Sequence, residues 1–144
     1  MGLRTRFPTE GSMPLNRYQR TRADHRKEYA EDYCELIDDL LREKGRARLC
    51  DLAEILGVSS VAVSKTIQRL KREGLLESPP YRPVRLTEKG RELAKQAREN
   101  HRLVRSFLES IGVPPEVADA DAEGIMHHVS EQTLAAFRAE LARR

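Results

Sequence analysis

Apolar residues repeat at helical spacing along most of the chain, which predicts a mainly α-helical fold. The first repeat covers residues 25–44 and places its apolar side chains on one stripe: Tyr29, Tyr33, Ile37, Leu40 and Leu41. Gly45 follows as a helix-closing residue. Residues 1–24 contain proline, glycine and scattered arginine without a period, which predicts a flexible basic tail.

The most specific pattern lies in residues 49–73, where two short helical repeats flank Gly57. Ser59 or Ser60 is placed to cap the second repeat, whose inward positions are Val63, Ile67 and Leu70. Two short helices joined by a glycine turn are typical of a helix-turn-helix. The segments 75–77 and 84–87 around a proline-rich loop then predict two short strands, the wing of a winged helix.

Three further helices are predicted beyond the wing. Thr87 caps a long one that ends near Ile111, a second covers residues 116–128, and Ser130 caps the last. These helices enclose too little surface for a core of their own, so we expect them to pack on the first helix and on a second copy of the chain. The predicted divisions are a tail (1–24), a winged helix-turn-helix DNA-binding domain (25–90) and a helical metal-binding and dimerisation domain (91–144).

Charge is distributed unevenly along the sequence. Residues 28–41 hold six acidic residues and no lysine or arginine, whereas residues 42–91 hold twelve basic and six acidic residues. This pattern suggests cation binding in the first segment and polyanion binding in the second. Because no apolar run reaches the roughly 20 residues of a membrane span, and the N-terminal arginines lack the apolar segment of a signal peptide, we expect a cytoplasmic protein with no membrane partner.

The second helix of the helix-turn-helix exposes small, hydrogen-bonding and basic side chains near its amino terminus, where a recognition helix meets base edges and phosphates. An arginine in the wing is placed to reach phosphate or a minor groove. The alternative is a helical hairpin with a structural role only. The candidate DNA-binding residues are Ser60, Val61, Ser64, Lys65, Gln68, Arg69 and Arg82.

Candidate metal ligands are spread over three predicted helices. Glu123 and His127 are four residues apart, so on a helix their side chains share one face. Asp32 and Glu35 share a face of the first helix and have the oxygen ligands that a hard cation prefers. His101 lies in the apolar stripe of the long helix. Each alone is more often an ordinary surface carboxylate or a core histidine.

Together these motifs resemble the diphtheria-toxin-repressor family of metalloregulators, and within it the short manganese transport regulators. The motifs occur in the family's order: Asp32-Tyr33-x-Glu35, a winged helix, a histidine in the next helix, and Asp121-Ala122-Glu123-Gly124-x-x-His127-His128-x-Ser130. The resemblance implies a divalent cation, Mn2+ before Fe2+ or Zn2+, between the DNA-binding and dimerisation domains. The implied ligand positions are Asp32, Glu35, His101, Glu123, Met126 and His127.

Met126 departs from the family pattern, which usually has a carboxylate at this position. A thioether is a weak partner for hard Mn2+, so we expect one tight and one weak or empty cation site per chain. The alternatives are that the backbone carbonyl of Met126 serves as the ligand, or that its side chain only fills space.

The sequence therefore predicts a homodimeric, metal-dependent transcriptional regulator rather than an enzyme. We expect a manganese-responsive repressor of metal-transport genes that binds a pseudopalindromic double-stranded DNA operator. The alternatives are a winged-helix regulator that senses an organic ligand, and a small metallohydrolase that uses the same acidic and histidine groups around an open metal position.

Overall fold

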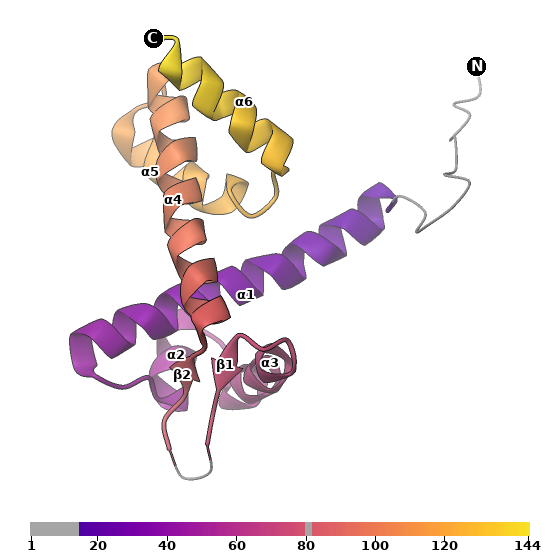
Figure 1. The fold of residues 1–144 in the computed structure, drawn as a ribbon, viewed down its shortest axis with the longest axis vertical. Coiled ribbons are helices and arrows are strands. Elements are labelled where there is room, and N and C mark those ends of the chain that lie inside the picture. The colour runs from indigo at the N-terminus through magenta and orange to yellow at the C-terminus, as the bar shows by residue number, and fades with distance from the viewer. Residues whose placement is uncertain (1–14, 80–81) are drawn as a thin grey trace.

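The computed structural model describes residues 15–79 and 82–144 and confirms the mainly helical fold with a winged helix-turn-helix (Figure 1). Its elements in chain order are α1 (Arg17–Lys44), α2 (Leu49–Leu56), α3 (Ser60–Arg72), β1 (Leu76–Glu77), β2 (Arg85–Leu86), α4 (Glu88–Ser110), α5 (Pro115–Ile125) and α6 (Glu131–Ala142). None of the helices in the described ranges is both long and apolar enough to cross a membrane.

Helix α1 begins at Arg17, so the prediction of an aperiodic tail is wrong for residues 17–24. The Asn16 side chain accepts hydrogen bonds from the backbone amides of Tyr18 and Gln19, and the Gln19 side chain accepts one from the Asn16 amide. This capping box satisfies amides that the helix leaves unpaired, and it starts a helix without any apolar stripe. Residues 1–14 of the predicted tail lie outside the described residues.

The inward face of α1 also differs from the predicted stripe at one position. Tyr29 is 52% exposed, and the smaller Ala30 and Cys34 are buried instead, alongside Tyr33 and Ile37. Close contact with α4, which crosses α1 in Figure 1, explains the preference for small side chains on this face.

The winged helix forms as predicted. Gly57 takes a left-handed conformation between α2 and α3, with φ of 69°, and the Ser59 hydroxyl caps α3 at the amide of Ala62. Strands β1 and β2 pair antiparallel, with Leu76 opposite Leu86. The buried side chains of α3 pack with those of α1 and of the two strands in one apolar cluster.

Helix α4 connects this winged-helix half to a second, smaller apolar cluster (Figure 1). Helices α5 and α6 pack against its far part, with a core made of Ala97, Val104, Ala122, Met126 and Leu134. Helix α5 ends at Ile125 rather than at the predicted His128. The backbone must be extended again at Ser130, the N-cap of α6, so the residues between form a turn that carries His127 and His128.

Candidate metal centre and nucleic-acid interface

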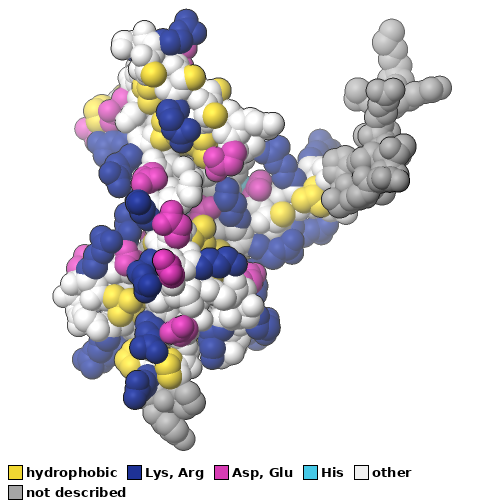
Figure 2. Space-filling model, viewed as in Figure 1, with side chains coloured by type: hydrophobic (Ala, Val, Ile, Leu, Met, Phe, Trp, Pro, Cys, Tyr) yellow, Lys and Arg dark blue, Asp and Glu magenta, His cyan; other side chains and the backbone are white. Residues whose placement is uncertain are grey.

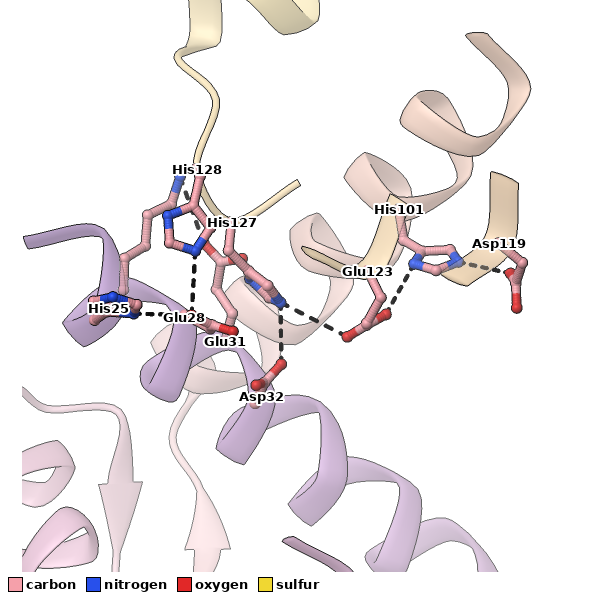
Figure 3. Close-up of polar contacts among 10 residues, drawn as sticks. His25, Glu28, Glu31, Asp32, His101, Asp119, Glu123, His127 and His128 are labelled. Carbon is pink, nitrogen blue, oxygen red and sulfur yellow. Dashed lines mark hydrogen bonds and ion pairs between the residues drawn. The ribbon is translucent and has the colours of Figure 1, made fainter. Parts of the chain in front are cut away.

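Acidic and histidine side chains from three helices and one turn meet at the junction of the two halves. Figure 3 shows Asp32 on α1, His101 on α4 and His127 in the turn after α5 directed toward Glu123 of α5 or toward one another. The structure thus brings together residues that lie far apart in the sequence.

His127 is the most enclosed member of this group, with 1% of its surface exposed. Its Nδ1 lies 2.8 Å from Glu31 Oε2, and its Nε2 lies 3.1 Å from Asp32 Oδ1 and 3.7 Å from Glu123 Oε1. Burial alone would lower the pKa of His127, but the adjacent carboxylates of Asp32, Glu123 and Glu31 raise that pKa to about 11. The imidazolium therefore provides the positive charge among these carboxylates.

Glu123 links the two histidines. Its Oε2 lies 2.9 Å from His101 Nδ1, while the other ring nitrogen of His101 lies 2.9 Å from Asp119 Oδ1. The adjacent imidazole of His127 is the main reason that the pKa of Glu123 is lowered, and hydrogen bonding to His101 lowers the pKa of Asp119. Both carboxylates are thus held in the ionised form that binds cations.

Glu35 lies beside this group, and its Oε1 atom has no hydrogen-bond partner. Burial, followed by the charge of Glu123, raises the pKa of Glu35 to about 7, although Arg98 acts in the opposite direction. Among the described residues, the buried side-chain atoms without a hydrogen-bond partner are Glu35 Oε1, His101 Nδ1, His127 Nε2 and Arg69 Nε.

Those unpartnered atoms test whether a cation fits. Three of the four belong to the acidic and histidine group, and each can offer a lone pair to a metal ion once the proton that the free protein holds there is released. His101 Nδ1 lies 2.9 Å from Glu123 Oε2 and His127 Nε2 lies 3.1 Å from Asp32 Oδ1, both without hydrogen-bond geometry. Oxygen and imidazole donors in this number suit a divalent first-row metal. The residues present therefore fit such an ion.

Met126 has apolar surroundings. Its side chain is fully buried and packs in the apolar cluster with Ala97, Val104, Ala122 and Leu134. This packing favours the space-filling alternative for the side chain and argues against the thioether as a ligand.

Two residues at this junction were not among the predicted ones. Glu31 is 2% exposed and contacts His127 Nδ1, and Asp119 contacts His101 Nε2. A carboxylate on the second ring nitrogen fixes the tautomer and leaves the first nitrogen free to bind a metal. The acidic run of α1 contained Glu31, but its spacing alone did not separate it from Asp32.

The metal-ligand candidates also border the helix-turn-helix. A shallow pocket of about 270 Å³ is lined by Asp32, Glu35 and Glu123 together with Ile55 and Leu56 of α2. The acidic residues are therefore direct neighbours of α2.

The predicted DNA-reading face of α3 is open to solvent. The exposed residues are Ser60, Val61, Ser64, Lys65 and Gln68, and Arg82 in the wing is exposed as well. Val61 is 64% exposed, and an apolar side chain at this position of a recognition helix suits contact with a thymine methyl group. Figure 2 shows lysine and arginine side chains at the base of the wing and on both flanks of the winged-helix half.

Arg69 is an exception among the predicted DNA-binding residues. Its guanidinium donates to the backbone carbonyl of Arg26 at 3.1 Å, and its Nε lies 3.6 Å from Glu73. The arginine therefore ties α3 to α1 and does not extend from the exposed face. The helical period explains the difference, because Arg69 neighbours the buried Leu70 and leans toward α1.

Comparisons with protein families match both halves of the chain. Residues 27–84 match the family described as iron dependent repressor, N-terminal DNA binding domain. Residues 87–143 match the family described as iron dependent repressor, metal binding and dimerisation domain.

Individual relatives agree with these matches. The chain is 51% identical over 121 residues to the transcriptional regulator MntR of Escherichia coli O6:H1, covering 84% of this chain and 78% of that protein. It is 43% identical over 104 residues to the HTH-type transcriptional regulator MntR of Bacillus subtilis strain 168, covering 72% of this chain and 73% of that protein.

Solved structures resemble the fold. A manganese-dependent transcriptional repressor in complex with manganese superimposes with a TM-score of 0.68 at 30% identity, covering 78% of this chain. The manganese regulator SloR superimposes with a TM-score of 0.67 at 28% identity, covering 80% of this chain. The chain spans about half the length of these two structures, 52% and 54%.

Proposed function

The chain belongs to the iron-dependent repressor family, and on that premise we propose that Asp32, Glu35, His101, Glu123 and His127 hold the divalent cation that controls its binding to DNA. The family consists of transcriptional regulators rather than enzymes, and this chain is a metal-dependent DNA-binding regulator. The organic-ligand sensor and the metallohydrolase are not favoured.

Manganese is the cation that this donor set suits best. Three carboxylates and two imidazoles provide mainly hard oxygen ligands, and Mn2+ prefers carboxylate, carbonyl and water oxygens. The names of the MntR relatives, and the repressor structure in complex with manganese, support the same choice. When bound, the ion supplies the positive charge that balances these carboxylates.

The five residues act by joining the two halves of the protein. Asp32 and Glu35 are fixed on α1 of the winged-helix half, whereas Glu123 and His127 belong to α5 and the turn after it. Ligation of both sets at one point holds α1 against the second half of the protein. The population then shifts toward the arrangement of two recognition helices in a dimer that fits DNA.

We place α3 in the major groove, with Lys65 and Arg82 near phosphates and Ser60, Val61, Ser64 and Gln68 toward base edges. A symmetric dimer reads two equivalent half-sites, so the operator is expected to be pseudopalindromic. Repression of metal-transport genes is the output expected of a regulator that binds its operator in the presence of the metal.

The observation that supports the ligand assignment is that buried, unpartnered atoms of Glu35, His101 and His127 lie beside the carboxylates of Asp32 and Glu123 at the domain junction. It is tested by the variants Asp32→Ala and His127→Ala, with the exposed carboxylate Asp121→Ala on α5 as the matched control. Fluorescence anisotropy with operator DNA, titrated with Mn2+, measures the effect.

We expect each ligand variant to need at least about tenfold more Mn2+ for the same DNA affinity, equivalent to about 1.4 kcal/mol. Circular dichroism and sedimentation should show both variants folded and dimeric, and Asp121→Ala should behave like the wild type. Unchanged Mn2+ dependence in both Asp32→Ala and His127→Ala would rule out this ligand set.

A further inference from the structure

A second group of metal-binding side chains lies beside the proposed centre and includes none of its ligands. His25 and Glu28 of α1 and His128 of the turn after α5 each bring a donor atom to within 4.8 Å of the others. His128 Nε2 is 3.2 Å from Glu28 Oε2, and His25 Nδ1 is 3.4 Å from the same oxygen. Figure 3 shows the rings of His25 and His128 on either side of Glu28.

The distances in this group match those of a tetrahedral metal site. Zinc ligands lie about 2.0–2.2 Å from the ion, so neighbouring ligand atoms in a tetrahedron are about 3.3–3.6 Å apart. The two nitrogen–oxygen distances, 3.2 and 3.4 Å, are close to that range. The His25 and His128 rings pack edge to face, with an interplanar angle of 79°, rather than stacking, so their nitrogens can approach a common ion from different directions.

His128 also has the orientation that metal-binding histidines show. Its Nδ1 lies 3.7 Å from Asp24 Oδ2, whereas its Nε2 faces Glu28. The same arrangement holds for His127, with Glu31 behind it, and for His101, with Asp119 behind it. A carboxylate on one ring nitrogen leaves the other nitrogen as the metal donor. Asp24 therefore faces the ring nitrogen of His128 that is turned away from Glu28.

We propose that His25, Glu28 and His128 form a second divalent-cation site that selects a borderline metal such as Zn2+. Two imidazoles and one carboxylate favour zinc over manganese, which prefers oxygen-rich sites. The side chains of Glu28 and His128 are about one-third exposed, at 29% and 34%, and His25 is 54% exposed. This exposure gives the ion access from solvent and leaves a coordination position for water.

The site extends the connection between α1 and the second half of the protein. Consecutive turns of α1 present Glu28 to His128, and Glu31 and Asp32 to His127. Glu28 also lies within 4.8 Å of donor atoms of Asp32 and His127, so its carboxylate stands between the two groups. Ligation here fixes the exposed N-terminal half of α1, which the first centre does not reach.

The test measures metal binding directly and does not depend on DNA. Equilibrium dialysis with Zn2+, and the intense visible absorption of tetrahedral Co2+, are compared for wild type, His25→Ala, Glu28→Gln and Asp32→Ala. The His25 side chain is largely exposed, so its removal is expected to leave the fold intact.

We expect His25→Ala and Glu28→Gln each to bind one Zn2+ fewer per chain, or to bind it at least tenfold more weakly, and to lose the tetrahedral Co2+ spectrum. Asp32→Ala should keep that spectrum, which separates this site from the proposed manganese centre. The proposal would be overturned if His25→Ala bound Zn2+ with the stoichiometry and affinity of the wild type. His25, Glu28 and His128 would then be a group of hydrogen-bonded side chains without a metal-binding role. A Co2+ spectrum lost in Asp32→Ala but kept in His25→Ala would overturn it equally.

Discussion

The pKa values of individual residues describe which side chains of the metal centre carry protons before a cation binds. His127 carries a proton among three carboxylates, and Glu35 retains its own proton to about pH 7. These protons partly replace the charge that a cation brings. The protons therefore reduce the repulsion among the acidic groups of the metal-free protein. They also compete with the metal for the same side chains.

Glu35→Gln tests this account through stability. Burial and the charge of Glu123 raise the pKa of Glu35 from 4.5 to about 7, so the folded protein binds this proton more tightly than the unfolded chain. Stability therefore falls as pH rises from 4.5 to 7, and the full cost is present above pH 7. The shift corresponds to at most about 3 kcal/mol, which solvent screening of this half-buried group reduces to about 1 kcal/mol.

We expect Glu35→Gln to raise the free energy of unfolding of the metal-free protein by about 1 kcal/mol near pH 8 and to change it little near pH 4. Urea denaturation at both pH values measures this difference, with the exposed Glu99→Gln on α4 as the control. The same variant should bind Mn2+ more weakly. An equal effect of Glu35→Gln at the two pH values would contradict the assigned pKa.

The variant Met126→Glu tests whether the lack of a carboxylate at position 126 weakens the binding of a second cation. At an effective dielectric constant of about 20, two unit charges 4 Å apart interact by about 4 kcal/mol, so an added carboxylate should bind a second Mn2+ that the natural chain holds weakly. Because position 126 is fully buried among apolar side chains, the metal-free variant should be destabilised by about 2 kcal/mol or more. Mn2+ should restore more stability to this variant than to the parent.

Calorimetry with Mn2+ counts the ions bound per chain. The measurement uses a His25→Asn background, so that the proposed site of His25, Glu28 and His128 does not contribute to the count. One tight ion is expected in that parent and two after Met126→Glu, whereas the neutral Met126→Gln should lose stability without gaining an ion. Two tight ions in the parent would show that Met126 does not weaken the binding of a second Mn2+.

Helix α3 is expected to contain two kinds of DNA-contacting residue. Some should recognise the base sequence, and others should bind the phosphates of any DNA. Lys65 and Ser64 are adjacent and exposed on the same helix, but only Lys65 carries a charge. Lys65→Ala should weaken binding to all sequences and lower the slope of log affinity against log salt by about 1.

Ser64→Ala is the matched comparison, and it should change sequence preference while leaving the salt slope unchanged. Binding isotherms over a series of salt concentrations, with operator and scrambled DNA, distinguish the two effects. A wild-type salt slope in Lys65→Ala would move the phosphate-binding face of the protein elsewhere.

At the scale of the whole molecule, the metal is expected to act on the distance between the two DNA-binding halves of a dimer. Cys50 on α2 is exposed and accepts a fluorophore, whereas Cys34 is fully buried and burial is the main reason that its pKa rises to about 12. Near neutral pH only Cys50 should react with a maleimide dye. Each protomer then carries one label beside its recognition helix.

Energy transfer between donor- and acceptor-labelled protomers reports the separation of the two Cys50 residues. Mn2+ should narrow the distribution of transfer efficiencies in the wild type and leave it broad in Asp32→Ala. The same narrowing in Asp32→Ala would mean that the metal orders the dimer through other residues.

The sequence by itself determined the elements whose stability is local. The Gly57 turn, the Ser59, Thr87 and Ser130 caps and the apolar repeats of α3 and α4 depend on neighbours within a few residues, so their patterns were sufficient to predict them. The family motifs named Asp32, Glu35, His101, Glu123 and His127, and the structure brings these residues together at one junction.

Tertiary structure decided what depends on distant partners. Local spacing could not show that Glu31 and Asp119 support the two histidines, that Arg69 turns to α1, or that Met126 packs into an apolar cluster. Each of these contacts joins segments far apart in the chain, and whether a polar group is buried or paired is fixed only when the segments pack together. The placement of His128 beside Glu28 has the same origin, since a turn after α5 meets a turn of α1 only in the folded protein.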